Sequence, residues 1–352
     1  MGARERAALP CAAVIELDGA SGEGGGQILR TALSLSAVTG QPFRIERIRA
    51  RRRNPGLLAA HLAAVRAAAA CCDAEVEGAR LGAASLTFRP RALRSGEHHI
   101  AIGTAGSTTL VLQTMLWPLA LAQGHSSVVI EGGTHNPLAP TAEFVSQVLV
   151  PRLQAIGVTL SVTCDRVGFH PRGGGRLRAE IDGGAALQPL QLLQRGPIVS
   201  QRAVAMAAGL PAHVLARELA VVRARLGWDA RSCEARTVSS PGPGNVLQLE
   251  LRWQGGAESV AAFGARGVPA ERVADQAVDE LERLLALDVP VGAHLADQLM
   301  VPMALAGAGS LRTVAPSLHT RTNAEIIACF VPVAFELRAR DDGAWSLDVR
   351  AR

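Results

Sequence analysis

Two kinds of hydrophobic pattern alternate along this chain. In short segments such as Val14–Leu17 and Phe43–Ile48, apolar and polar residues alternate as in strands with one buried face. In longer segments such as Ile28–Val38 and Leu57–Cys72, the apolar residues recur at helical spacing. The order strand, helix, strand, helix, strand, strand recurs with a period of roughly 80–100 residues. The chain is therefore predicted to contain several copies of one supersecondary unit.

Three of the predicted helices share one design. Their similar segments begin at Gln27, Thr109 and Gln298, small residues precede the helices, and each segment is followed by a glycine and a strand. A second type of helix recurs over Leu57–Cys72 and Thr141–Ala155, each running directly into a strand. We therefore predict an α/β (α+β) fold in which three β-α-β-α-β-β repeats form a large domain.

The stretch 185–288 contains a separate set of predicted strands and helices. It has predicted strands of its own at Ile198–Ala205 and Val246–Trp253, and predicted helices at Ala216–Leu226 and Ala270–Leu285. We predict that 185–288 forms a smaller α/β domain, inserted into a large domain that occupies 13–184 and 289–340.

A glycine-rich turn lies between the first strand and the first helix, over Asp18–Arg30. Gly24, Gly25 and Gly26 let a ligand approach the backbone closely, and the first turn of a helix favours an anion. The run matches neither the G-x-G-x-x-G pattern nor the P-loop. Its functional interpretation is a phosphate site, and the alternative is an ordinary turn between a strand and a helix.

Composition excludes several functions. Although 48% of the 352 residues are apolar, no apolar run reaches the roughly 18–20 residues that span a bilayer. The first residues lack the apolar core of a signal peptide, so a cytoplasmic protein with no membrane partner is expected. The six cysteines show no metal-ligand spacing, which indicates buried, reduced thiols.

The charged residues point to an acidic partner. The formal net charge is +5, and every Lys-or-Arg position is arginine. The absence of lysine excludes a lysine nucleophile, and the absence of tyrosine with only 3% aromatic residues argues against base-stacking platforms. The arginine run 44–53 fits phosphate oxygens or, alternatively, a solvated strand edge.

One histidine stands apart from the others. His319 lies in a polar stretch that is predicted to be a turn between a strand and the helix Ala324–Phe330. A histidine at such a junction can point into a cleft. In a chain without lysine, imidazole is the plausible nitrogen nucleophile for covalent nucleotidyl transfer.

These segments together resemble the RNA 3′-terminal phosphate cyclase family across nearly the whole chain. The similar segments, in the family's order, are Leu17–Arg30, Ile48–Ala50, Pro55–Leu58, Ala101–Ser107, Leu110–Gln113, Gly132–Thr134, Asn136–Pro137, Gly173–Gly175, Gly242–Asn245, Leu295–Gln298 and His319.

The resemblance implies a fold of three β-α-β-α-β-β repeats with a small domain inserted before the last. It also implies that ATP adenylates a histidine, that AMP passes to an RNA 3′-phosphate, and that the 2′-OH then attacks to form a 2′,3′-cyclic phosphate. The implied partners are ATP, a Mg²⁺ or Mn²⁺ ion and RNA 3′-phosphate ends, while association into a homodimer stays open.

The resemblance also assigns roles to individual residues. His319 would be the nucleophile, and Glu23 would lie near the triphosphate as the metal ligand. Arg30, Arg49 and Arg52 would hold phosphates of ATP or of the RNA end. The nucleotide pocket would be lined by Gln113, His294, Leu295, Ala296, Asp297, Gln298 and Glu23.

The chain departs from the family pattern at several positions. Ala60 replaces a glutamine, His294 replaces an aromatic residue, and Arg51 and Arg53 add charge. Two alternatives remain beside the enzyme. A non-catalytic RNA-binding relative that acts in ribosome assembly would lack the histidine, which His319 argues against. An enolpyruvyl transferase with the same repeats would depend on lysine, which this chain does not have.

Overall fold

The first repeat unit has the predicted order of elements. The computed structural model describes residues 13–352. Its first elements are β1 (Ile15–Asp18), α1 (Gly26–Thr39), β2 (Phe43–Glu46), α2 (Ala59–Cys72), β3 (Glu75–Glu77) and β4 (Leu86–Arg89). They form a sheet of order β1-β2-β4-β3, in which β1 and β2 are parallel and the other pairs are antiparallel.

The second unit repeats this plan. Its elements are β5 (Gly96–Ala101), α3 (Thr108–Leu121), β6 (His125–Gly132), η1 (Phe144–Leu149), α4 (Val150–Ala155), β7 (Thr159–Arg166) and β8 (Gly175–Asp182). The sheet order is β5-β6-β8-β7. The helix expected at Thr141–Ala155 is present, but η1 is a π-helix. Such a segment is often found at functional sites.

The third unit is interrupted. Its elements are β9 (Leu190–Leu192), α7 (Ala293–Leu305), β14 (Ala308–Thr313), α8 (Leu318–Phe330), β15 (Val333–Ala339) and β16 (Trp345–Ala351). The sheet reads β9-β14-β16-β15, the same order as in the other two units. Leu190 pairs in parallel with Gly309, so β9 is the first strand of this unit.

This pairing corrects the predicted limits. The insertion lies inside the last unit, after its first strand, and not before the unit. The start at 185 is too early because β9 (190–192) belongs to the third sheet, and the end at 340 omits β16. We propose that the inserted domain comprises residues 193–287.

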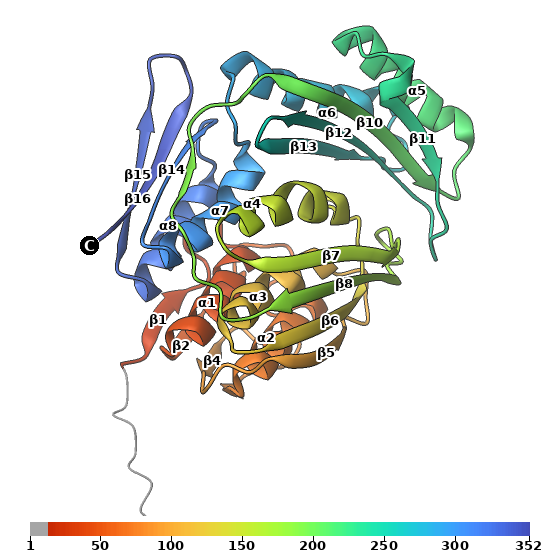
Figure 1. The fold of residues 1–352 in the computed structure, drawn as a ribbon. Helices are drawn as coiled ribbons and strands as arrows, with labels where there is room; N and C mark the ends of the chain where they lie inside the picture. Colours follow the sequence, from red (N-terminus) through yellow and green to blue (C-terminus); the bar gives the residue numbers. More distant parts are fainter. Residues whose placement is uncertain (1–12) are drawn as a thin grey trace, which may run out of the picture.

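The inserted segment forms a separate layer, at the top of Figure 1. Its elements are β10 (Ile198–Ala208), α5 (Ala212–Leu226), η2 (Ala230–Ser232), β11 (Cys233–Thr237), β12 (Gly244–Trp253), β13 (Gly256–Phe263) and α6 (Ala270–Leu287). The sheet order is β11-β10-β12-β13. Residues of α5 and α6, such as Leu219 and Leu281, pack with Leu247 of β12 in a hydrophobic cluster distinct from the main core.

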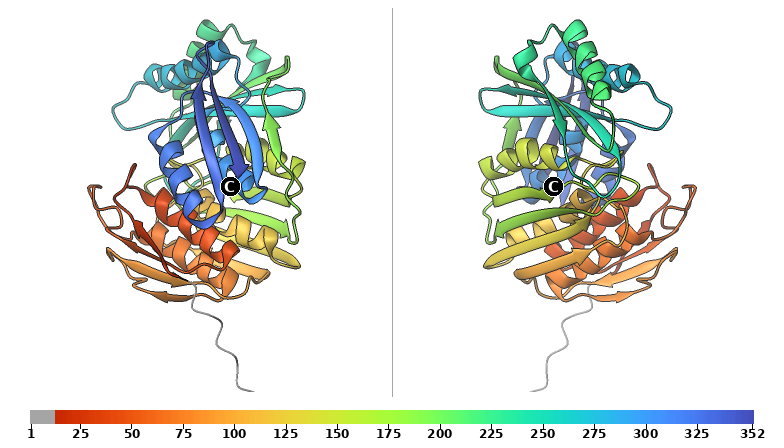
Figure 2. Two further views of the ribbon diagram at one scale, coloured as in Figure 1. Left: turned by 90° about the vertical axis from the view of Figure 1, so that its left-hand side faces the viewer. Right: turned by 90° about the vertical axis from the view of Figure 1, so that its right-hand side faces the viewer.

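The main core lies where the helices of the three units meet. Helices α1, α2, α3 and α8 pack against one another inside, with the sheets around them (Figures 1 and 2). In β2, Phe43 and Ile45 are buried in this core, whereas Arg44 and Glu46 face outward. The burial of apolar surface that drives this arrangement contributes about 25 cal/mol per Å². The architecture brings the first turns of α1, α7 and α8 together.

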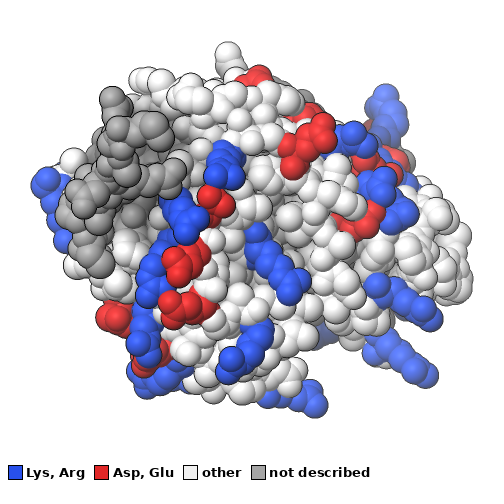
Figure 3. Space-filling view, turned by 90° about the horizontal axis from the view of Figure 1, so that it is seen from below, with Lys and Arg blue, Asp and Glu red and all other residues white. Residues whose placement is uncertain are grey.

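Many surface arginines are paired with carboxylates. Ion pairs such as Arg44–Glu46 and Arg94–Asp73 lie in the first unit, and the lower face in Figure 3 shows basic and acidic side chains next to each other. The positive net charge is therefore not by itself the mark of a binding face. Within residues 13–352, no helix is both long and apolar enough to cross a membrane.

Candidate active site

The glycine-rich turn is held against helix α8. Gly22 has φ +49°, and a Cβ there would lie 2.2 Å from Oγ1 of Thr322, so this position requires glycine. The backbone N–H of Glu23 donates to the same Oγ1 at 3.0 Å. Deeper in the interface, Thr31 Oγ1 donates to Asn323 Oδ1 at 2.8 Å. These contacts fix α1 and its preceding turn beside α8.

His319 lies in the first turn of α8 and not in a turn before the helix, which corrects our prediction. Ser317 is the N-cap, and its hydroxyl accepts from the backbone N–H of Thr320 at 3.0 Å. The Nδ1 atom of His319 lies 2.9 Å from Oε1 of Gln27. Because that oxygen can only accept, Nδ1 carries the proton and Nε2 keeps its lone pair.

The surroundings of His319 favour the neutral imidazole. Burial lowers its pKa from the ordinary value, and the positive charges of Arg52 and Arg30 act in the same direction, against an opposing effect from Asp297. Neutral imidazole is the nucleophilic form. The side chain remains 52% exposed, so a ligand can reach it.

A cluster of nitrogen groups lies beside the first turn of α1. Burial, with added repulsion from Arg49, lowers the pKa of Arg30 to about 10. Burial also lowers the pKa of His61 to about 3, and Arg30 and Arg49 contribute to that shift. No carboxylate pairs with Arg30 or Arg49 among the residues that the structure describes. The cluster thus has the charge and the hydrogen-bond donors of an anion site.

Gly26 allows this cluster to form. A Cβ at this position would lie 2.4 Å from Nε2 of His61 and 2.6 Å from Nη1 of Arg30. The N-terminal end of α1 therefore touches both side chains, and its dipole adds to the attraction for an anion. His61, for which we predicted no role, belongs to this cluster. Its place after Pro55–Leu58 in the matched region was the available signal.

Arg52 and Glu23 form an ion pair at the same place. Arg52 also donates to the backbone oxygen of Glu23 at 3.1 Å. The Glu23 side chain is 9% exposed, and its Oε1 lies 3.7 Å from Nε2 of His319. Its other oxygen, Oε2, is buried and has no hydrogen-bond partner within residues 13–352. The predicted residues Glu23, Arg52 and His319 therefore come together, whereas Arg49 turns to backbone carbonyls, with Nη1 3.1 Å from the oxygen of Gly56.

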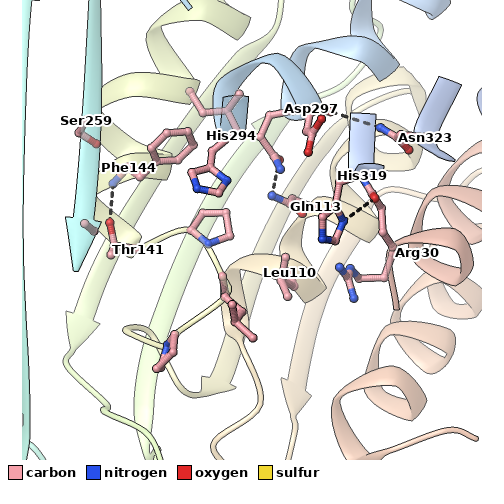
Figure 4. Close-up of a pocket in the computed structure, with 18 of the residues that line it drawn as sticks. Arg30, Leu110, Gln113, Thr141, Phe144, Ser259, His294, Asp297, His319 and Asn323 are labelled. Atoms are coloured by element: carbon pink, nitrogen blue, oxygen red, sulfur yellow. Dashed lines mark hydrogen bonds between the residues drawn. The ribbon is translucent and has the colours of Figure 1, made fainter. Parts of the chain in front are cut away.

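A cavity of about 610 Å³ opens next to His319. Figure 4 shows His319, Arg30 and Gln113 at one end, with Phe144 and Ser259 at the other. The polar residues that line it are Gln27, Arg30, Thr31, Ser34, Gln113, Thr141, Ser259, Gln276, Glu280, His294, Asp297, Gln298, His319 and Asn323. The volume suits a ligand of nucleotide size. Gln276 and Glu280 come from the inserted segment, and no sequence signal pointed to them.

Helix α7 supplies three of the predicted residues to the cavity. Gln298 accepts a hydrogen bond from Gln113 of α3. Asp297 accepts from Thr320 Oγ1 at 2.6 Å, and burial raises its pKa. His294 is exposed, with Nε2 3.7 Å from Oε1 of Glu280.

The other two predicted residues of α7 turn away from the cavity. Leu295 is fully buried and Ala296 is 2% exposed, both in the main core. They do not line the cavity, because adjacent helical residues point in different directions. The predicted contact of these two side chains with a nucleotide is therefore corrected to a packing role.

Comparison with known proteins agrees with these observations. The family model described as RNA 3′-terminal phosphate cyclase matches residues 21–337. The chain belongs to this family. A curated relative, the RNA 3′-terminal phosphate cyclase of Koribacter versatilis (strain Ellin345), is 48% identical over 332 residues, which are 94% of each chain. This degree of identity to a named cyclase identifies the chain as an enzyme.

Among solved structures, the enolpyruvyl transferase NikO from Streptomyces tendae was found at 17% identity. It covers 48% of this chain and 32% of its own chain with a TM-score of 0.29, which is too low to carry an argument.

Proposed function

We propose that this enzyme uses ATP to convert an RNA 3′-phosphate into a 2′,3′-cyclic phosphate through a covalent AMP on His319. The cyclase family implies ATP and RNA as substrates and a ligase-type reaction. The observation that carries the mechanism is the hydrogen bond from Nδ1 of His319 to Gln27, which leaves the lone pair of Nε2 available inside the cavity.

The reaction divides into three displacements. Nε2 of His319 attacks the α-phosphorus of ATP, so a P–N bond forms and pyrophosphate leaves. An oxygen of the RNA 3′-phosphate then attacks the same phosphorus, the P–N bond breaks, and the neutral imidazole is restored. The 2′-OH loses its proton as its oxygen attacks the 3′-phosphorus, and AMP leaves. The last step is intramolecular and gains from proximity.

The residues of the cavity can be given roles in this scheme. Arg30, with the first turn of α1 and the neutral His61, would hold the phosphates, because this cluster has no carboxylate partner for Arg30 among the described residues. Phe144 and His294 would enclose the base, and Gln113 with Gln298 would lie beside the sugar. Arg52 and Arg49 would meet the RNA end from the loop after β2.

One residue of this site, Glu23, is suited to bind a divalent cation. The buried, unpartnered Oε2 of Glu23 is suited to ligate a hard cation such as Mg²⁺ or Mn²⁺, and phosphate oxygens and water would complete the coordination. The bound ion would neutralise charge on the triphosphate. The described residues contain no cluster of three or more His, Cys, Asp or Glu side chains that could hold a metal ion.

The test is a covalent label. We expect the wild-type protein, incubated with α-labelled ATP and Mg²⁺, to carry an acid-labile, alkali-stable AMP. His319→Ala and His319→Asn should lose both the label and cyclic phosphate formation by at least a thousandfold, which is the scale for loss of a catalytic nucleophile. Both variants should melt close to the wild-type temperature, because the imidazole is half-exposed.

His99→Asn is the matched control, because His99 is an exposed histidine on β5 and is not among the residues that line the cavity. It should retain the label. A labelled His319→Ala protein would place the nucleophile elsewhere. A wild-type protein that binds RNA but never becomes labelled would favour a non-catalytic RNA-binding role.

A further inference from the structure

Glu258 is a buried carboxylate that the proposed reaction does not use. It lies on β13 of the inserted segment and is 5% exposed. Its Oε1 accepts from the backbone N–H of Ser259 at 3.0 Å, and its Oε2 accepts from the backbone N–H of Gly292 at 2.6 Å. Gly292 belongs to a different element, at the point where the chain leaves the insertion and re-enters the third unit.

Gly292 is the N-cap of α7. Glycine has no side chain that could cap the helix. The Glu258 side chain comes from a remote part of the sequence but takes the place of a local cap. Its carboxylate brings negative charge to the positive end of the helix. A Cβ at Gly292 would lie 2.9 Å from Oε2 of Glu258, so a larger residue there would displace the carboxylate. The φ of Gly292 is −78°, so backbone strain plays no part.

The helix that Glu258 holds is the one that carries nucleotide-pocket residues. The first turns of α7 bear His294, Asp297 and Gln298, all of which line the cavity. Gln298 is joined to Gln113 across the cavity, and Asp297 to Thr320 of the helix that bears the proposed nucleophile. A displacement of the start of α7 would therefore move one wall of the cavity.

Arg152 of α4, in the large domain, contacts the hairpin formed by β12 and β13. It is 5% exposed, and its Nη1 donates to the backbone oxygen of Gly255, beside the turn between β12 and β13. Its guanidinium carbon lies 5.7 Å from the ring centroid of Trp253. Burial raises the pKa of Glu258 to about 7, and the positive charge of Arg152 opposes that rise. The β12–β13 hairpin is thus held on one side by α4 and holds α7 on the other.

We propose that Glu258 is a positioning residue for the nucleotide: through Gly292 it sets the start of α7 and so couples the inserted domain to ATP binding. It touches no substrate in this scheme. The inference rests on the proposed function of the cavity as the ATP site. It adds a role for the insertion, which is to hold the wall formed by α7.

The test measures binding without chemistry. α,β-Methylene-ATP is titrated calorimetrically into each protein, because its α–β link is not cleaved by attack at the α-phosphorus. We expect Glu258→Ala to weaken binding about tenfold or more, which is the scale reported when supporting contacts of a binding site are removed. Gly292→Ala should weaken binding in the same direction. Glu258→Gln keeps an acceptor oxygen and should recover part of the affinity.

Glu218→Ala is the matched control. Glu218 is also a fully buried glutamate of the insertion, but its hydrogen bond goes to Asn245 within the insertion. It should bind the analogue within twofold of wild type. At saturating ATP, Glu258→Ala should leave the KM for RNA within twofold, since the anion cluster on α1 is untouched.

Two results would overturn this role of Glu258. One is wild-type affinity in folded Glu258→Ala and Gly292→Ala proteins. The other is an equal loss of affinity in Glu218→Ala, which would mean that only the stability of the insertion matters. A wild-type protein that does not bind the analogue would instead reject the proposed nucleotide site itself, and this inference with it.

Discussion

At the residue scale, His319 depends on the charges that surround it. Gln27 orients the imidazole, while burial and the guanidinium groups of Arg52 and Arg30 keep its pKa below the ordinary value. A lowered pKa means that the neutral form persists to lower pH than for a free histidine. Formation of the enzyme–AMP adduct should therefore stay constant as pH falls to about 6.5, and decline only below that value.

Replacement of Arg52 should move this decline. Arg52→Gln removes a positive charge and leaves the Glu23 carboxylate unpaired 3.7 Å from Nε2, and both changes raise the pKa of His319. We expect the acid limb of adduct formation, measured in single turnovers without RNA, to shift to higher pH. The neighbouring exposed residue Arg53 provides the control, since Arg53→Gln should leave the profile in place. Superimposable profiles for wild type and Arg52→Gln would contradict this electrostatic account.

The sequence indicated which residue types would form the site, but not which of their atoms would be in contact. The lysine-free composition and the position of His319 indicated a histidine nucleophile. The Gln27–His319 contact joins residues 292 positions apart, so no local pattern could reveal it. Leu295 and Ala296 were assigned to the pocket because they share a motif with Asp297. The helical rotation per residue, which a motif does not encode, turns them into the core.

At the element scale, the start of α1 is defined by close packing. Gly26 is the first residue of the helix; alanine is favoured over glycine by about 1 kcal/mol in a helix interior, which is an upper limit for this first position. The neighbouring His61 and Arg30 leave no room for that methyl group. The glycine is therefore retained for the site, at a cost in helix propensity.

Gly26→Ala should separate activity from stability. We expect its melting temperature to change little, because the gain in propensity offsets the local displacement. The KM for the RNA 3′-phosphate or for ATP should rise about tenfold or more, because Arg30 and His61 are pushed aside. A control is Gly196→Ala, where the nearest atom to a Cβ is at 3.4 Å, an ordinary contact. Wild-type kinetics for Gly26→Ala would show that the cluster does not bind the substrate's phosphates.

Helix boundaries were predictable where the helical period runs without interruption, as in α2 and α6. They failed at α8, where we expected a helix only from Ala324. Ser317 and Thr320 form the actual cap, so the helix begins at Leu318, six residues earlier, and the polar residues after the cap concealed the helical period. The π-helical hydrogen bonds of η1 were also out of reach, since a shift of backbone partners leaves the apolar spacing nearly unchanged.

At the scale of the whole molecule, the two joints of the insertion differ. Around the first joint, Leu193 is 47% and Val199 66% exposed. At the second joint, Val289 and Val291 are buried, and Arg312 donates to the backbone oxygen of Asp288 at 2.6 Å. The three repeats could be recognised from sequence. The position of the interruption after the first strand of the third unit could not, because β9 has only three residues and its partner β14 lies more than a hundred residues away.

Limited proteolysis should reflect this difference. We expect a protease of broad specificity to cut first within 193–199 and to spare 288–292, because cleavage requires an exposed backbone that can open locally. Mass spectrometry of the early fragments gives the sites. Glu258→Ala, which releases Gly292, should make the second joint more susceptible, and Glu218→Ala should not. Early cleavage at 288–292 in the wild type would contradict the tight second joint.

The interruption of the third unit also bears on the order of assembly. As the chain leaves the ribosome, the first two units are complete by residue 182, but β9 must wait for β14 to emerge. Pairing of β9 with β14 closes a long loop, but the entropic cost of closing a loop rises only slowly with its length. The delay before the two strands pair is therefore set more by the time needed to synthesise the insertion than by this cost. Helices α7 and α8, which complete the pocket, are among the last elements to be made. A nascent chain would thus hold a folded two-unit core before it can bind a nucleotide, and catalytic competence would arise only as its final sheet closes.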